Sequence, residues 1–287
     1  MEPVVDVFFG SGGGGGKLEP IVVFEELGKG PLREVAVLFF RAVYDQSREA
    51  DWASDVHFSA DGTLIEAQAS MKSFVRQDGA DAEKVDKSKD DDPVNPIIEF
   101  KAETRRNDTR QSTTDPEAVF YRMGRGKEAR LAYVFHALME NRNGLLAEFD
   151  VDNPIEVSEA AMALRQLQAC AQDSGHIPRT AAGDKGYHTK AFVQQCRNMG
   201  VRPHVAQIEK RRVKGLDGRT TRTSGYKTSQ RIRKQIEEHF GWMKVVGGLR
   251  RTIHRGSDRV AACSSFITAA CNLVLLSRLA HAPPGGA

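Results

Sequence analysis

The sequence predicts a mixed α/β fold, and three observations lead to that class. Short apolar segments that alternate as strands are followed by segments with the 3.6-residue periodicity of amphipathic helices. The dipeptide Asn143-Gly144 lies between two of the apolar segments and is typical of an antiparallel hairpin. A chain of 287 residues can also bury a sizeable core. We therefore expect a mixed sheet with helices on both faces.

The N-terminal third is irregular in composition. Residues 10–16 are almost entirely glycine, which suits neither helix nor strand, and the phosphate-loop ending Gly-Lys-Ser/Thr is missing because Leu18 follows Lys17. Residues 35–53 have helical periodicity, and residues 56–60 alternate as a strand that we expect to end at Asp61-Gly62. Residues 75–118 are polar and rich in charge, which predicts a mobile insertion.

The remaining elements alternate between strand and helix. We expect strands at 130–139 and 145–151, a helix at 157–172, a strand at 179–184, a helix at 190–199, a strand at 201–207, a basic loop at 209–226, and helices at 228–246 and 260–280. A ribonuclease-H-like sheet has this order of elements, and other mixed α/β folds share it.

The positive charge is concentrated in one segment. The net charge is only +3, yet residues 210–255 contain 14 Lys or Arg against three Asp or Glu. A local basic patch of this kind is typical of a surface that binds nucleic acid. The four cysteines are widely spaced with no Cys-x-x-Cys pair, which argues against a zinc ribbon or a disulfide scaffold. No apolar run reaches the roughly 18–20 residues that cross a bilayer, and no signal peptide begins the chain, so we expect a soluble intracellular protein.

Three acids stand where they could hold a metal ion beside a polyanion. Asp61 and Asp184 each follow an apolar strand, and Glu237 lies in a helix among cations. Two Mg²⁺ ions held by carboxylates are a common device for phosphoryl transfer on nucleic acid. Each acid also has an ordinary interpretation: a turn residue for Asp61 and Asp184, and a surface ion pair with Arg233 or Lys234 for Glu237.

The chain resembles the DDE transposases of bacterial insertion sequences, in the broad IS-four/IS-five group, over roughly residues 38–280. The resemblance rests on blocks in the right order, which are residues 57–67 around Asp61, 127–132 with 139–145, 183–188 with 203–206, and the helix around Glu237. That helix carries the family spacing of Arg233, Glu237 and Lys244. Gln230 stands where the family has Tyr, which is a departure.

The resemblance implies a ribonuclease-H-like catalytic domain and assigns roles to residues. Asp61, Asp184 and Glu237 would be the catalytic ligands of two Mg²⁺ ions, for which Mn²⁺ would substitute. Arg233 and Lys244 would contact DNA phosphates near the scissile bond. On one continuous helix they would share a face with Glu237, from which Glu238 points about 100° away. Further cations expected to bind the phosphate backbone are Arg211, Arg212, Lys214, Arg231 and Lys234.

The expected partner is double-stranded DNA, both the terminal repeats of an element and its target, with a homo-oligomer assembled on it and no membrane. The expected place is the bacterial cytoplasm, at the nucleoid. Residues 1–30 would be a disordered Gly-rich segment, 31–54 the remnant of a truncated N-terminal helical region, and 55–282 the catalytic domain. The main hypothesis is a Mg²⁺-dependent transposase; the alternatives are a non-catalytic DNA-binding remnant and a nuclease of the same fold.

Overall fold

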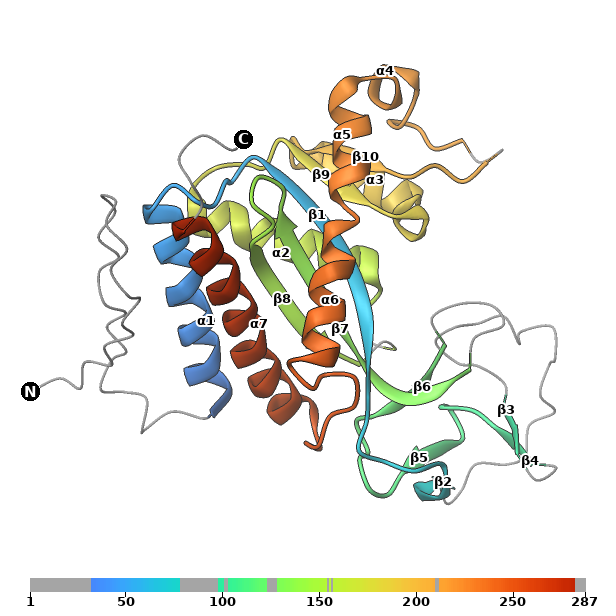
Figure 1. Cartoon of the computed structure of the whole chain (residues 1–287). Helices are drawn as coiled ribbons and strands as arrows, with labels where there is room; N and C mark the ends of the chain where they lie inside the picture. Colours follow the sequence, from blue (N-terminus) through green and yellow to red (C-terminus); the bar gives the residue numbers. More distant parts are fainter. Residues whose placement is uncertain are drawn as a thin grey trace, which may run out of the picture.

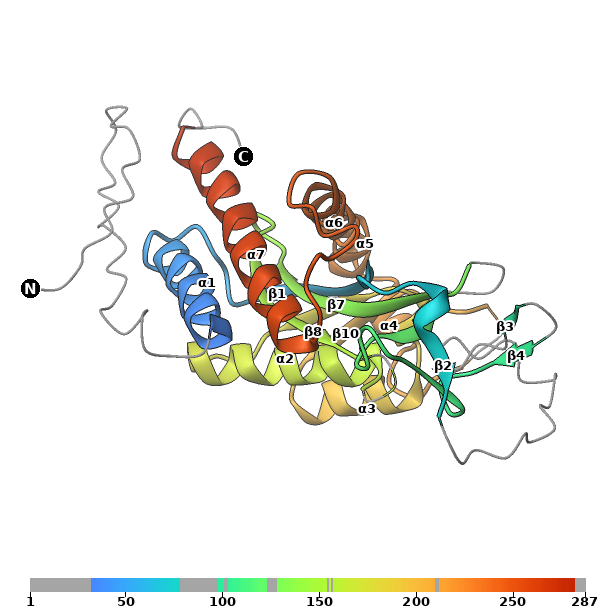
Figure 2. The same cartoon turned by 90° about the horizontal axis from the view of Figure 1, so that it is seen from below.

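The computed structural model describes residues 32–77, 98–100, 103–122, 128–153, 155, 157–209 and 212–281. The Gly-rich segment, most of the charged part of the insertion, and Lys210 and Arg211 lie outside these residues. Six strands form a mixed sheet, and helices cover both of its faces, as Figures 1 and 2 show. The mixed α/β, ribonuclease-H-like prediction is confirmed.

The main sheet has the strand order β10-β9-β1-β7-β6, and β8 also pairs with β7. Strand β1 pairs antiparallel with β7 and parallel with β9, while β7 and β8 form the expected antiparallel hairpin. The strands are β1 (His57–Glu66), β6 (Val119–Tyr121), β7 (Arg130–Glu140), β8 (Leu146–Asp152), β9 (Thr180–Gly183) and β10 (Arg202–Val205). All residues of β7 after Arg130 are buried, as expected for a central strand covered on both faces.

The helices divide between the two faces of the sheet. In Figure 2, α6 (Gln235–Val245) and α7 (Ser257–Ala280) lie on one face, and α2 (Glu159–Ser174) and α3 (Lys190–Asn198) lie on the other. Helix α1 (Leu32–Glu49) runs beside α7 and buries the stripe Ala36, Phe40, Val43, Tyr44 and Ser47, which has helical spacing. Two further helices of the described chain are α4 (Gly218–Thr221) and α5 (Ser224–Ile232).

The hairpin turn between β7 and β8 is closed by a buried acid. The carboxylate of Glu140 accepts hydrogen bonds from the backbone N–H groups of Arg142 at 2.9 Å, Asn143 at 2.7 Å and Leu145 at 3.2 Å. These donors compensate for taking the carboxylate out of water. The predicted Asn-Gly turn is therefore present, with its backbone donors held by the last residue of the preceding strand.

The region 75–118 contains short strands that its charge pattern did not predict. Among the described residues, β2 (Phe74–Arg76) pairs with β5 (Arg110–Ser112), and β3 (Ile98–Phe100) pairs with β4 (Glu103–Arg105). Figure 1 shows these strands beyond one end of the main sheet. The helix Met71–Ser73 leads into β2 as a single 3-10 turn.

Helix α7 corrects one expectation about membranes. Within the described residues it is the one helix long and apolar enough to cross a bilayer, with a mean hydropathy of 1.8. The sequence reading missed it because Ser, Thr and Asn interrupt the apolar run. A little over half of the apolar stretch is buried inside the protein, and α7 packs along α1 and β8. Burial of this kind is typical of a core helix.

Candidate carboxylate site

Asp61 lies in the middle of β1, and the expectation that the strand ends at Asp61-Gly62 is wrong. Strand β1 continues to Glu66, and Asp61 pairs with Ala137 of β7. Pairing with the long strand β7 outweighs the turn preference of Asp-Gly. Ala137 belongs to the core cluster that contains Ile236 and Phe240 of α6, so the side chain of Asp61 points toward the α6 face of the sheet.

Asp184 follows the neighbouring strand directly. The pairing of β1 with β9 places Ser59 opposite Ala182, so continuing this register by two residues brings Asp184 beside Asp61. Asp184 caps the 3-10 helix Lys185–Tyr187, and its Oδ1 accepts a hydrogen bond from the Gly186 N–H at 2.7 Å. The expected turn at this strand end is therefore present.

The end of β9 leaves part of β1 without a neighbour on that side. Pairing with β9 stops at Ser59, and the next contact on the same edge is the isolated bridge between Glu66 and Arg251. Within the described chain, we call the intervening stretch of β1, residues 60–65, the open edge. Asp61 lies on the open edge, and Asp184 lies where the edge begins.

Glu237 comes from a helix that the structure divides in two. The expected single helix 228–246 is α5 and α6, which are joined at Arg233 and Lys234, and the expected loop 209–226 contains α4 and the start of α5. At the joint the bonds tighten to the i→i+3 pattern, with the Ile236 N–H donating to the Arg233 carbonyl at 3.2 Å. Arg233 therefore ends α5, and Glu237 lies in the first turn of α6 with an exposed side chain.

The three acids share one electrostatic environment. The pKa of Asp61 is raised to about 6, chiefly by burial; the charges of Asp184 and Glu237 also raise it, while the Gly62 N–H and Arg233 act in the opposite direction. The Arg233 guanidinium lies 3.9 Å from the Asp61 carboxylate. The structure thus brings Asp61, Asp184, Glu237 and Arg233 into one neighbourhood from four elements.

The donor chemistry of this neighbourhood suits a hard divalent cation. Carboxylate oxygens are the ligands that Mg²⁺ and Mn²⁺ prefer, and a cation would relieve the repulsion that Asp61 experiences. Within the described residues, however, no three Asp, Glu, His or Cys side chains are gathered closely enough to hold an ion. The role of the three acids as metal ligands stays a prediction, and it requires their side chains to rotate toward one another.

The predicted DNA-binding cations lie in several environments. Lys244 is half-buried, and its Nζ donates to the Thr63 hydroxyl at 2.6 Å, two residues beyond Asp61 on the same face of β1. Burial and the charge of Arg250 lower the pKa of Lys244. The side chains that lie exposed are Arg212, Lys214, Arg231 and Lys234. The prediction for Arg211 falls outside the described residues.

Two side chains that follow Asp184 are buried. His188 is fully buried, and its Nδ1 accepts a hydrogen bond from the Ile208 N–H at 2.9 Å. Tyr187 is also buried, and its ring would collide with a side chain at position 183, since an added Cβ on Gly183 would lie 2.8 Å away.

The sequence analysis missed Glu159 at the start of α2. The pKa of Glu159 is raised to about 7, chiefly by burial and then by the charges of Asp61 and Asp184, against the lowering effect of the Tyr121 hydrogen bond. Glu159 therefore belongs to the same electrostatic neighbourhood. An acid in the first turn of a helix is common for reasons of helix stability alone, so the pattern gave no signal of this placement.

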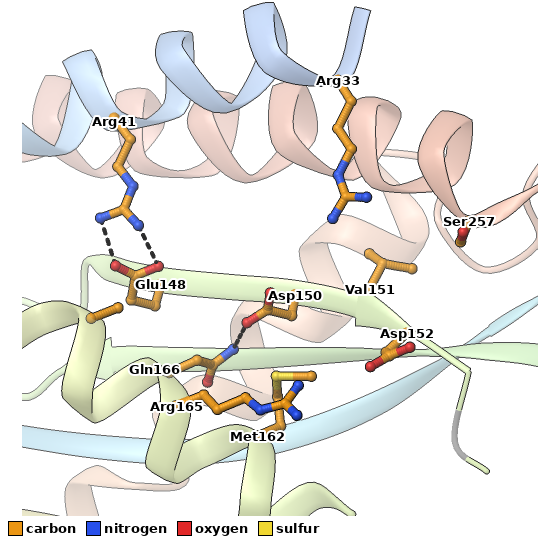
Figure 3. A pocket seen from close by; sticks show the side chains of 11 residues that line it. Arg33, Arg41, Glu148, Asp150, Val151, Asp152, Met162, Arg165, Gln166 and Ser257 are labelled. Carbon is orange, nitrogen blue, oxygen red and sulfur yellow. Dashed lines mark hydrogen bonds and ion pairs between the residues drawn. The ribbon is translucent and has the colours of Figure 1, made fainter. Parts of the chain in front are cut away.

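A polar hollow lies at the β8 side of the sheet, between α1 and α2, with a volume of about 400 Å³ (Figure 3). Three arginines and three acids line it. Arg41 approaches Glu148 at 2.6 Å, and the Gln166 amide donates to Asp150 at 3.0 Å. A hollow with balanced charge has no excess of cations for a polyanion, and the Arg41–Glu148 ion pair fastens α1 to β8.

Comparisons with known proteins identify the family of the chain. The family model described as the transposase DDE domain matches residues 54–273. No curated protein matches the chain. Two solved structures are weakly similar. The "Mos1 transposase paired-end complex with left transposon end" has 8% identity and a TM-score of 0.25 and covers 93% of this chain and 67% of that one. The "pre-cleavage Mos1 transpososome" has 9% identity and a TM-score of 0.24 and covers 92% and 68%. TM-scores of this size carry no weight for fold or function.

Proposed function

Because the chain belongs to the transposase DDE domain family, we propose that it is a DNA transposase that cuts and joins DNA by metal-dependent phosphoryl transfer. We further propose that it serves a bacterial insertion sequence of the IS-four/IS-five group. The proposal rests on one observation: the charges of Asp184 and Glu237 act on the carboxylate of Asp61, although the three acids come from three different parts of the chain. All three acids fall within the matched domain.

In the proposed site, Asp61, Asp184 and Glu237 would hold two Mg²⁺ ions. When bound, the ions would neutralise charge that develops on the reacting phosphate. Arg233 lies 3.9 Å from Asp61 and would hold a phosphate oxygen next to the carboxylates. Lys244, anchored to Thr63 on the same face of β1, would support the phosphate from the other end of α6.

The proposed reaction has two steps of the same type. In the first, a water oxygen attacks a phosphorus atom and loses a proton to solvent, and the bond to the 3′ oxygen breaks; this oxygen takes up a proton from solvent to give a 3′-OH. In the second, this 3′-OH attacks a phosphodiester of the target, so that one phosphorus–oxygen bond forms while another breaks. Neither step needs an oxidant or a reductant.

The exposed cations around α5 would hold duplex DNA across this site. Arg212, Lys214, Arg231 and Lys234 are exposed side chains on or before the elements that carry Arg233 and Glu237. Contacts of this kind bind the phosphate backbone and do not read sequence. The arrangement supports double-stranded DNA as the partner.

A non-catalytic DNA-binding protein is the second candidate. It is favoured by one observation, namely that no three acids of the described residues gather at one point. Such a protein would keep the basic surface and would bind DNA without cutting it.

A cleavage assay separates these functions. The substrate is a duplex that contains the end of the element, incubated with Mg²⁺ and the wild type, Glu237→Gln or the matched control Glu238→Gln on the same helix. We expect wild type and Glu238→Gln to nick the DNA, and Glu237→Gln to lose at least about 100-fold in rate while it still binds. Binding without nicking by the wild type would support the non-catalytic candidate. A supercoiled target plasmid adds the third distinction, because a nuclease would cut without producing joined molecules.

A further inference from the structure

Glu159 reaches the neighbourhood of Asp61 from the opposite face of the sheet. It opens α2, directly after the N-cap Ser158, and α2 packs on the face away from α6. The Tyr121 hydroxyl lies 3.5 Å from Glu159 Oε1. Asp61 points to the α6 face, so the backbone of β1 separates it from a carboxylate on the α2 side.

At Gly62 no side chain covers this backbone on the α2 side. Gly62 follows Asp61 and faces the α2 side, because successive residues of a strand point to opposite faces. A Cβ added at position 62 would lie 3.4 Å from Glu159 Oε1 and 3.4 Å from His136 Nδ1. The carboxylate of Glu159 therefore lies against bare backbone on the open edge, immediately beside Asp61.

The same spot contains a buried side chain with unused hydrogen-bonding capacity. His136 is 2% exposed, and neither of its ring nitrogens has a hydrogen-bond partner among the described residues. Burial lowers its pKa to about 4, so the ring is neutral and offers one donor and one acceptor. An unsatisfied imidazole next to a carboxylate indicates a site for a polar ligand rather than for core packing.

The electrostatic effects agree with this geometry from two directions. The pKa of Glu159 is raised by burial and then by the charges of Asp61 and Asp184. Tyr187, which is fully buried between these elements, has its pKa raised by burial and then by Glu159, Asp61 and Asp184 together. Glu159 is thus a member of the carboxylate group, not a surface acid of α2.

We propose that Glu159 is a fourth carboxylate of the site and a positioning residue that strengthens the binding of a divalent cation at Asp61 and Asp184. This inference rests on the proposed function, since it assumes that the site takes a cation. Glu159 would act through the hydrogen-bonded layer around the ion, with His136 as its neutral partner. Outer-layer groups of this kind typically change metal affinity by about 10–100-fold.

Direct cation binding tests the proposal without relying on activity. Free Mn²⁺ is measured by electron paramagnetic resonance during titration of the full-length protein in the absence of DNA. We expect Glu159→Gln to raise the Mn²⁺ dissociation constant by about tenfold or more. The control Glu49→Gln, an exposed acid at the end of α1, should leave it unchanged.

Two outcomes distinguish the failure of this inference from the failure of the proposed function. If the wild type binds no Mn²⁺, the metal-dependent function itself fails. If the wild type binds Mn²⁺ and Asp61→Asn weakens binding but Glu159→Gln does not, the fourth-carboxylate assignment fails and the function stands.

A second variant separates a local effect from a loss of folding. Gly62→Ala leaves every charge in place and puts a methyl group between Glu159 and the open edge, at ordinary contact distance. We expect weaker Mn²⁺ binding with an unchanged thermal unfolding transition. Partial recovery of affinity in Glu159→Asp relative to Glu159→Gln would support the carboxylate role, whereas equal loss in both would contradict it.

Discussion

Burial and like charges make the ionised form of Asp61 unfavourable in the folded, metal-free protein. Its pKa rises from the ordinary 3.8 to about 6, while the side chain is only 19% exposed. A group whose folded pKa is raised favours folding below its unfolded pKa, and this contribution is lost as the pH rises through the folded pKa. Asp61 therefore lowers stability most at neutral and higher pH.

Asp61→Asn should stabilise the metal-free protein at pH 8. A shift of about two pKa units corresponds to roughly 3 kcal/mol, and partial exposure reduces the expected gain to about 1–3 kcal/mol. Urea unfolding in EDTA at several pH values measures it. The gain should shrink as the pH falls from 7 to 4, because Asp61 of the wild type is then protonated in the folded state.

A control variant tests whether the stability gain of Asp61→Asn is specific to the carboxylate group. Asp108→Asn, an exposed acid outside the carboxylate group, should show no comparable gain at pH 8. A gain for Asp61→Asn that stays constant from pH 4 to pH 8 would show that ionisation of Asp61 is not its cause.

At the scale of elements, α5 and α6 are attached to different parts of the sheet. Helix α5 is held to the β9–β10 side, where Gln230 donates to the carbonyls of Gly183 and His204, and the Tyr226 hydroxyl donates to the Val205 carbonyl at 2.8 Å. Helix α6 packs instead on β1, β7 and α7 through the core cluster of Phe240 and Met243. Arg233 lies at the joint between these two attachments.

Gln230→Ala should disturb the end of β9. Gly183 directly precedes Asp184, so losing the amide leaves two inner carbonyls without this donor and loosens the strand end that positions the acid. We expect the free energy of unfolding to fall by about 1–3 kcal/mol and cleavage to fall with it. Chemical denaturation and the cleavage assay measure the two effects.

The comparison for this variant is Gln195→Ala, an exposed glutamine of α3. It should change the free energy of unfolding by no more than about 0.5 kcal/mol. If Gln230→Ala behaves in the same way, the amide does not hold the end of β9.

Elements with a strong local signal could be predicted from the sequence, whereas those decided by distant partners could not. The α2 periodicity and the hairpin turn are local, and both were predicted within a few residues. The continuation of β1 past Asp61-Gly62 depends on β7, some seventy residues away. The joint at Arg233 has no Pro or Gly to mark it, and Glu159 enters the site only through folding that places α2 beside Gly62.

For the molecule as a whole, the excess of positive over negative charge lies in one part of a nearly neutral chain. The net charge of +3 conceals a segment with 14 cations and three acids, which builds α4, α5 and α6 with the loops on either side. Under the proposed function, charge placed in this way would steer DNA toward the carboxylate group.

DNA binding should therefore depend steeply on salt, and single cations should contribute measurably. Each phosphate neutralised changes log Kd by about 0.9 per unit of log salt concentration. We expect Arg212→Gln to reduce the slope by about 0.9, and Arg278→Gln, an exposed cation of α7 outside the basic segment, to leave it unchanged. Fluorescence anisotropy at 50–300 mM salt measures the slope. An affinity that does not vary with salt would contradict the basic segment as the DNA surface.

The open edge of β1 also affects how the protein resists aggregation. An exposed strand edge is a template on which another chain can add a strand. In the described chain this edge is bounded by β9 at one end and by the Glu66–Arg251 bridge at the other, so only a very short segment could pair with it. It also carries the charge of Asp61, which an incoming apolar strand would have to desolvate. The protein can thus keep part of a central strand unpaired without offering a site for β-sheet polymerisation.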